Sequence, residues 1–236
     1  MLKILSVAIE PLVRLIRHIL FRLESPRKPV LESIRERAVS ESAEFIQGQL
    51  NYAQLFEERE SLWDFALGKA SIPGLHLELG VWTGYSINYF AQKLPDQEIF
   101  GFDSFEGLAE DWVGTRLTKG AFDMGKALPK VHRNVTLIPG WFDATLPKFS
   151  MERSGPIAFL HLDADTYEST SLALKVLSRK IVAGSVLVFD EHHGYPNWQN
   201  GEFKAWNDYV KAENIKFHYI GFSDMAAAVQ ILESEA

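Results

Sequence analysis

The sequence contains no cysteine among its 236 residues. Disulfides, thiolate metal sites and cysteine nucleophiles are therefore excluded, and any bound metal must be held by oxygen or imidazole ligands. Basic charge is also scarce, because 24 Lys and Arg stand against 31 Asp and Glu, for a formal net charge of −7. A general nucleic-acid binder needs a concentrated basic face, so this balance argues against nucleic acid and favours a small or uncharged substrate.

Long uninterrupted apolar runs are missing as well. Residues 1–25 carry charges throughout and do not approach the roughly 18 apolar residues of a membrane-spanning helix. They also lack the apolar block and small-residue cleavage site of a signal peptide. Apolar residues recur there at helical spacing among basic ones, so residues 1–30 are expected to form a basic amphipathic helix and a linker.

Three roles are open for this helix: packing on its own domain, joining subunits into a homo-oligomer, or lying on an anionic membrane through residues 1–25. The expected location is the cytoplasm, with membrane association left open. The main domain is predicted over residues 31–236, with 47 % hydrophobic residues in the chain to supply its core. Residues 31–70, rich in helix formers, are predicted to form a helical cap before the α/β core of residues 71–236.

From residue 75 short apolar runs alternate with helical stretches. The runs are LHLELGV, EIFGFD, NVTLIPG, IAFLHLD and SVLVFD. Because parallel strands need crossover connections, which helices supply, the pattern predicts a doubly wound, mostly parallel, seven-stranded Rossmann-like α/β sheet. HYIGFS and AAAVQIL are expected to add a final antiparallel pair that fills one edge.

Acidic residues stop four of these runs. They are Glu78, Asp103, Asp163 and Asp190. Ligands of such sheets bind beyond the carboxyl ends of the strands, so the four carboxylates are expected to face one crevice.

The segment ELGVWTGYS joins the first of these strands to a helix. Glycine at positions 80 and 84 lets a ligand approach the backbone closely, although an ordinary glycine turn is the alternative. Asp103 lies 23 residues after Gly80, where an acidic side chain can accept hydrogen bonds from ribose hydroxyls. The G-x-G-x-x-G fingerprint of dehydrogenases is absent and a carboxylate precedes the turn, which favours S-adenosylmethionine, with its ammonium and sulfonium, over NAD.

Aromatic residues of the segment GWFDATLP can border an adenine ring or belong to the core, and both interpretations stay open. The predicted cofactor-binding residues are Glu78, Gly80, Thr83, Gly84, Tyr85, Ser86, Asp103, Ser104, Trp141, Phe142 and Asp163.

Five segments read together resemble the macrocin O-methyltransferase family of class I methyltransferases. They are ELGVWTGYS, GFDSFEGL, GWFDATLP, LDADTYEST and FDEHHGYPNW, and the resemblance covers residues 75–215. It implies a class I fold, S-adenosylmethionine as donor, a divalent cation (usually Mg²⁺) and a sugar-type hydroxyl as acceptor. By matching position it implies the metal ligands Asp163, Asp190 and Glu191, where relatives carry two aspartates in place of the last pair.

Methyl transfer requires that the acceptor hydroxyl lose its proton. A cation on these ligands can lower the pKa of that hydroxyl, and His192 or His193 can accept the proton, so Asp163 and the two histidines are the catalytic candidates. His161 lies inside an apolar run and is interpreted as a core histidine, and Asp165 as a residue that charges a helix start.

Residues 104–133 form an unusually long predicted connection, of the kind that serves as a lid or binding loop. Two other functions remain open: a catechol-type O-methyltransferase of small phenols with a similar metal site, and a non-catalytic module that binds S-adenosylmethionine. A nicotinamide oxidoreductase is a third.

Overall fold

The computed structural model describes residues 29–233. The predicted N-terminal helix therefore lies outside the described residues and stays a prediction. The chain divides into two units, residues 1–36 and 37–236, and the described part of the first contains the start of α2 (Val30–Gln47). Within the described range, no helix combines the length and the apolar character needed to cross a membrane.

The second unit is built on one sheet with the strand order β1-β7-β8-β6-β5-β2-β3-β4. Strand β8 runs antiparallel to both of its neighbours, and all other neighbouring pairs are parallel. The predicted doubly wound α/β class is therefore confirmed. The strands are β1 (Gln54–Leu55), β2 (Leu75–Leu79), β3 (Ile99–Asp103), β4 (Val135–Pro139), β5 (Ile157–Leu162), β6 (Val186–Phe189), β7 (Phe217–Phe222) and β8 (Ala227–Ile231).

The sheet has eight strands rather than the expected seven because β1 pairs with β7 at one edge. This short strand lies within residues 31–70, the stretch predicted to be a helical cap, and separates its two helices α2 and α3 (Arg59–Lys69). The final pair is antiparallel as predicted, but β8 enters the interior of the sheet between β6 and β7 instead of its edge.

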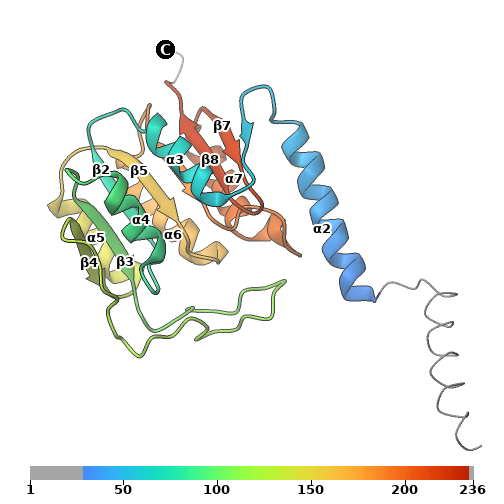
Figure 1. Ribbon diagram of the computed structural model, residues 1–236, viewed down its shortest axis with the longest axis horizontal. Coiled ribbons are helices and arrows are strands. Elements are labelled where there is room, and N and C mark those ends of the chain that lie inside the picture. Colours follow the sequence, from blue (N-terminus) through green and yellow to red (C-terminus); the bar gives the residue numbers. More distant parts are fainter. Residues whose placement is uncertain (1–28, 234–236) are drawn as a thin grey trace, which may run out of the picture. The chain divides into compact units, whose positions relative to one another are not determined.

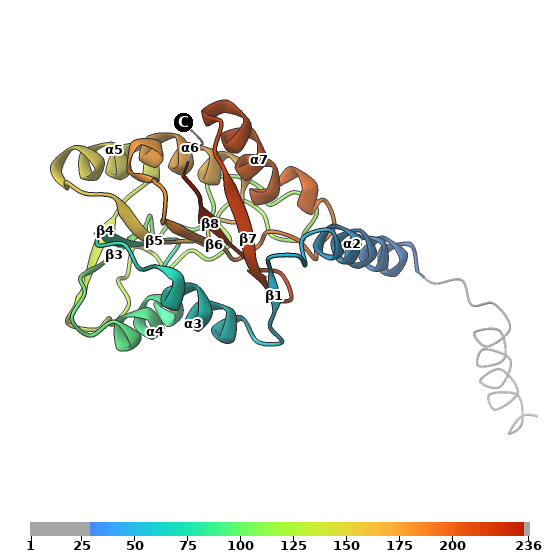
Figure 2. The same cartoon turned by 90° about the horizontal axis from the view of Figure 1, so that it is seen from above.

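Helices cover both faces of the sheet (Figure 1, Figure 2). Helices α5 (Phe142–Glu152), α6 (Tyr167–Leu177) and α7 (Glu202–Glu213) lie on one face, and α3 and α4 (Tyr85–Lys93) lie on the other. Strand β5 is buried at every position because both of its faces are covered. Leu160 and Leu162 pack into the cluster of the first face and Phe159 into that of the second, and each such side chain contributes about 1.5–3 kcal/mol by leaving water.

The connection between β3 and β4 carries no helix or regular strand within the described residues. It is the long green segment beside the strand ends in Figure 1. Gly114 anchors it, since this residue has a φ of 97° and a Cβ there would lie 2.0 Å from the carbonyl oxygen of Pro196. Trp112 packs edge-on against Tyr195, with 5.5 Å between ring centroids. The predicted long connection is therefore held against the segment that follows β6.

Candidate active site

A cavity of about 690 Å³ opens at the carboxyl ends of the central parallel strands. The loops after β2, β5 and β6, the end of β3 and the start of α5 form much of its wall. The strand ends converge as expected because β2, β3, β5 and β6 are mutually parallel. The predicted site residues that line it are Gly80, Thr83, Tyr85, Ser86, Asp103, Ser104, Trp141, Phe142, Asp163, Asp190 and Glu191.

Asp103, at the end of β3, holds the glycine loop in place. Its Oδ2 accepts hydrogen bonds from the backbone N–H of Val81 at 2.8 Å and of Trp82 at 2.7 Å. Its Oδ1 accepts one from the N–H of Phe105 at 2.7 Å. A carboxylate has about four lone-pair sites, so Asp103 retains capacity for one further donor in the cavity.

Gly80 brings the backbone of β2 against that of β5. Its φ is 93°, and a Cβ there would lie 1.7 Å from the carbonyl oxygen of Asp163, so no other residue fits without movement. Gly84 was expected to contact the cofactor, but it is not part of the cavity lining. It precedes α4 with a φ of 83° and lies under Pro129 of the long connection, which is 3.3 Å from the position of its Cβ.

Glu78 is also absent from the lining, contrary to the expectation, because it lies within β2 and its side chain is fully buried. Its Oε1 is 3.0 Å from Nδ1 of His161, whose Nε2 is 3.4 Å from Oδ1 of Asp190. Oδ2 of Asp190 accepts a hydrogen bond of 3.1 Å from Nη1 of Arg59. These four side chains form a row of alternating charge, which we call the ion row.

Charges within the ion row determine the protonation of its members. Burial lowers the pKa of His161, but the carboxylates of Asp190 and Glu78 outweigh it and raise this pKa to about 10. Burial raises the pKa of Asp190, whereas His161 and Arg59 pull it below its ordinary value. Asp190 is thus an ionised member of the row. His161 was interpreted as an ordinary core histidine, but its raised pKa favours a buried cation beside Asp190. On its other side burial raises the pKa of Glu78, although His161 opposes this shift.

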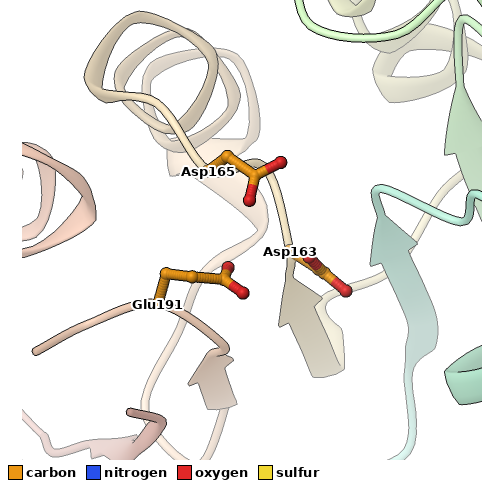
Figure 3. Close-up of side chains that lie close together, drawn as sticks. All are labelled: Asp163, Asp165 and Glu191. Carbon is orange, nitrogen blue, oxygen red and sulfur yellow. The ribbon is translucent and has the colours of Figure 1, made fainter. Parts of the chain in front are cut away.

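Three other carboxylates lie close together in the cavity. Single carboxylate oxygens of Asp163, Asp165 and Glu191 all lie within 4.8 Å of one another (Figure 3). We call these residues the carboxylate triad. It contains Asp165 in the place expected for Asp190, because the side chain of Asp190 is engaged in the ion row.

The triad is electrostatically strained without a counter-charge. Burial, followed by repulsion from neighbouring carboxylates, raises the pKa of Asp163 and Glu191 well above the ordinary range, and that of Asp165 to about 7. Asp165 also has a φ of 60°, a conformation that favours glycine. Oε2 of Glu191 is buried and has no hydrogen-bond partner among the described residues. Hard oxygen donors at this spacing, one of them unpartnered, fit a single divalent cation.

His192 and His193 lie away from the cavity, contrary to their expected catalytic role. Both rings are buried among aromatic side chains, with Nε2 of His192 3.2 Å from Oη of Tyr219 and Nε2 of His193 3.0 Å from the carbonyl oxygen of Ser223. Burial lowers the pKa of His192 well below its usual value and that of His193 to about 4. Neither imidazole is part of the cavity lining.

Aromatic side chains line the same cavity as the acidic residues. Trp82, Tyr85, Trp112 and Phe122 line the cavity together with the predicted Trp141. Trp82 is 50 % exposed and its ring meets that of Phe122 edge-on at 5.4 Å. Exposed rings beside carboxylates suit a ligand with both an apolar face and polar or cationic groups.

Comparison with known proteins shows similarity to methyltransferases. Residues 77–192 match a family model described as a methyltransferase domain. The 8-demethyl-8-(2,3-dimethoxy-alpha-L-rhamnosyl)-tetracenomycin-C 4'-O-methyltransferase of Streptomyces olivaceus is 29% identical over 143 residues, 51% of this chain and 54% of the relative. The mycinamicin III 3''-O-methyltransferase of Micromonospora griseorubida is 28% identical over 162 residues, 58% and 56% respectively. The chain spans about half the length of these curated relatives.

Solved structures resemble the fold over more of the chain. A calicheamicin methyltransferase superposes with a TM-score of 0.61 at 23% identity, covering 73% of this chain and 78% of its own. The O-methyltransferase NovP gives a TM-score of 0.58 at 22% identity, covering 74% and 80%. The described part of the chain therefore has the mixed α/β, Rossmann-like fold of these methyltransferases.

Proposed function

We propose that the protein transfers a methyl group from S-adenosylmethionine to a hydroxyl of a sugar or a glycosylated small molecule. One observation carries this proposal: the glycine loop, Asp103 and the carboxylate triad all face one cavity at the carboxyl ends of the strands. The two curated relatives support the acceptor class, since both are O-methyltransferases and one is named for a rhamnosyl-bearing tetracenomycin.

The cofactor is proposed to lie along the ends of β2, β3 and β4. Asp103 retains acceptor capacity for a ribose hydroxyl, next to the loop backbone that it holds. Trp141 and Phe142, at the start of α5, offer apolar surface for adenine. Gly80 lines the same end of the cavity, where the methionine part is proposed to lie.

The carboxylate triad is proposed to hold a divalent cation, with Mg²⁺ as the preferred ion for oxygen donors. When bound, such an ion supplies a Lewis acid that lowers the pKa of the acceptor hydroxyl. The alternative set, with Asp190 in place of Asp165, requires Arg59 to leave Asp190. The cavity lining contains no histidine within the described residues, so its carboxylates take the place of the imidazoles as proton acceptors.

Calorimetric titration with S-adenosylhomocysteine, with and without Mg²⁺, tests the proposed cofactor site and the proposed cation site. Labelled methyl transfer to sugar, glycosylated and catechol acceptors then tests the reaction. We expect S-adenosylhomocysteine binding and a labelled sugar product. Failure to bind S-adenosylhomocysteine would refute the cofactor assignment, transfer to catechols alone would indicate the small-phenol enzyme, and binding without any product would favour the non-catalytic module.

A further inference from the structure

Glu202, the first residue of α7, lies behind the carboxylate triad with no exposure to solvent. Its Oε2 accepts a hydrogen bond of 3.2 Å from the backbone N–H of Glu191. Its Oε1 accepts from the N–H of Ala164 at 3.4 Å and from the hydroxyl of Thr170 at 3.3 Å. Ala164 lies between the two aspartates of the triad. One side chain is therefore bonded to both segments that carry the triad.

Position 202 is an unfavourable place for an acid. Burial, together with the charges of Asp165 and Asp190, raises the pKa of Glu202 to about 8. An apolar side chain of similar size would avoid this cost, but it would leave two backbone N–H groups unpaired at about 1–3 kcal/mol each. Glutamine has the same length but a single acceptor oxygen, so its NH₂ group would face one of the two backbone donors. The ionised glutamate side chain has two acceptor oxygens and satisfies both.

The two hydrogen-bonded segments come from different strands. Ala164 follows β5, and Glu191 follows β6, while Glu202 enters from the helix that packs behind both. The distance between these segments sets the separation of the triad's oxygens, and oxygen ligands of Mg²⁺ must lie close to 2.0–2.1 Å from the ion. A brace between the segments therefore acts on the ligand geometry, although it does not touch the ion.

We propose that Glu202 is a positioning residue of the carboxylate triad, which it holds at the spacing that binds one divalent cation. This inference rests on the proposed function, because it concerns the same cation site. Partners that orient metal ligands from behind change metal affinity by about 10-fold to 100-fold when they are lost. The same range is expected here.

The test is Mn²⁺ binding to the full chain, measured by calorimetry and by the paramagnetic resonance signal of free Mn²⁺. Glu202→Gln is expected to weaken Mn²⁺ binding at least about 10-fold, and to leave S-adenosylhomocysteine affinity unchanged, since Glu202 is not part of the cavity lining. Thr170→Val is the matched control, because it removes one hydrogen bond to Glu202 and leaves both backbone bonds intact. Glu213→Gln, at the exposed end of the same helix, controls for lost charge.

Wild-type Mn²⁺ affinity in Glu202→Gln would overturn the inference, and so would an equal loss in Thr170→Val, which would indicate general packing. If Glu202→Gln does not fold, Glu202→Asp replaces it. The aspartate side chain is one methylene shorter, so its carboxyl does not reach both amides. Wild-type Mn²⁺ affinity in Glu202→Asp would therefore also overturn the inference. If the wild-type protein binds S-adenosylhomocysteine but no Mn²⁺, the cation part of the proposed function fails and this inference fails with it.

Discussion

Replacing His161 with leucine is expected to destabilise the protein by about 3–5 kcal/mol, the usual cost of removing one partner from a buried ion pair. The ring is fully buried, 3.0 Å from Oε1 of Glu78 and 3.4 Å from Oδ1 of Asp190. A rise of its pKa from 6.5 to about 10 corresponds to about 5 kcal/mol at 1.36 kcal/mol per unit. In this variant Asp190 still has Arg59 as its partner. The destabilisation therefore comes mainly from Glu78, whose buried side chain loses its cationic partner.

Urea unfolding of the wild type and the variant across a pH series measures this cost. The folded pKa of His161 lies above the unfolded value, so its contribution is fully present below about pH 6.5 and is lost as the pH rises through about 10. The stability difference should therefore shrink across that window. The double variant Glu78→Leu/His161→Leu should recover part of the loss, because it removes both charges.

His132→Leu is the control, because His132 is exposed and a surface change of this kind stays within about 0.5 kcal/mol. A His161→Leu variant as stable as this control below pH 6.5 would refute the ion row as a source of stability. A difference that grows toward pH 10 would refute the direction of the pKa shift.

Three further predictions concern the cavity and its surroundings. Asp163→Ala is expected to abolish methyl transfer with S-adenosylhomocysteine affinity retained in calorimetry; ordinary turnover in Mg²⁺-replete buffer would contradict it. In Gly80→Ala the new Cβ would lie 1.7 Å from a carbonyl oxygen. We expect the free energy of unfolding, measured in urea, to fall by more than the about 1–2 kcal/mol that left-handed strain alone costs. Gly120→Ala, with positive φ but open space, should show only that strain, and equal losses would argue against the close approach. Gly114→Ala should accelerate limited proteolysis of residues 104–134 several-fold by displacing them from Pro196, whereas unchanged cleavage would contradict that anchor.

The acidic strand ends were predictable because strand direction follows from the alternation of elements. Once β2, β3, β5 and β6 are parallel, Asp103, Asp163 and Asp190 must emerge at one edge of the sheet. What these side chains contact there was not predictable. Asp190 accepts a hydrogen bond from Arg59, which is 131 residues away in the chain and belongs to a helix with no recognisable motif. Asp165 takes the place of Asp190 in the triad. The only local sign of this in the sequence was the short spacing between Asp163 and Asp165.

Burial was the second property that the sequence left open. His192 and His193 follow a strand end directly, as a ligand or base would, and nothing in that position distinguishes a cavity residue from a core residue. The difference comes from α2 and β7, whose aromatic side chains Phe45 and Tyr219 close around His192. Glu202 was missed for the same reason, because its partners are backbone groups of distant segments.

The position of β8 has a consequence for how the molecule is assembled. Residues 227–231 supply the hydrogen-bonding neighbour of β6 and also the only strand to which β7 is joined on that side. A nascent or truncated chain without them exposes the open edge of β6, a site for pairing with other chains, and has no means of attaching β7 and β1. Cohesion of the sheet thus depends on a strand that follows all of its other described strands in the sequence.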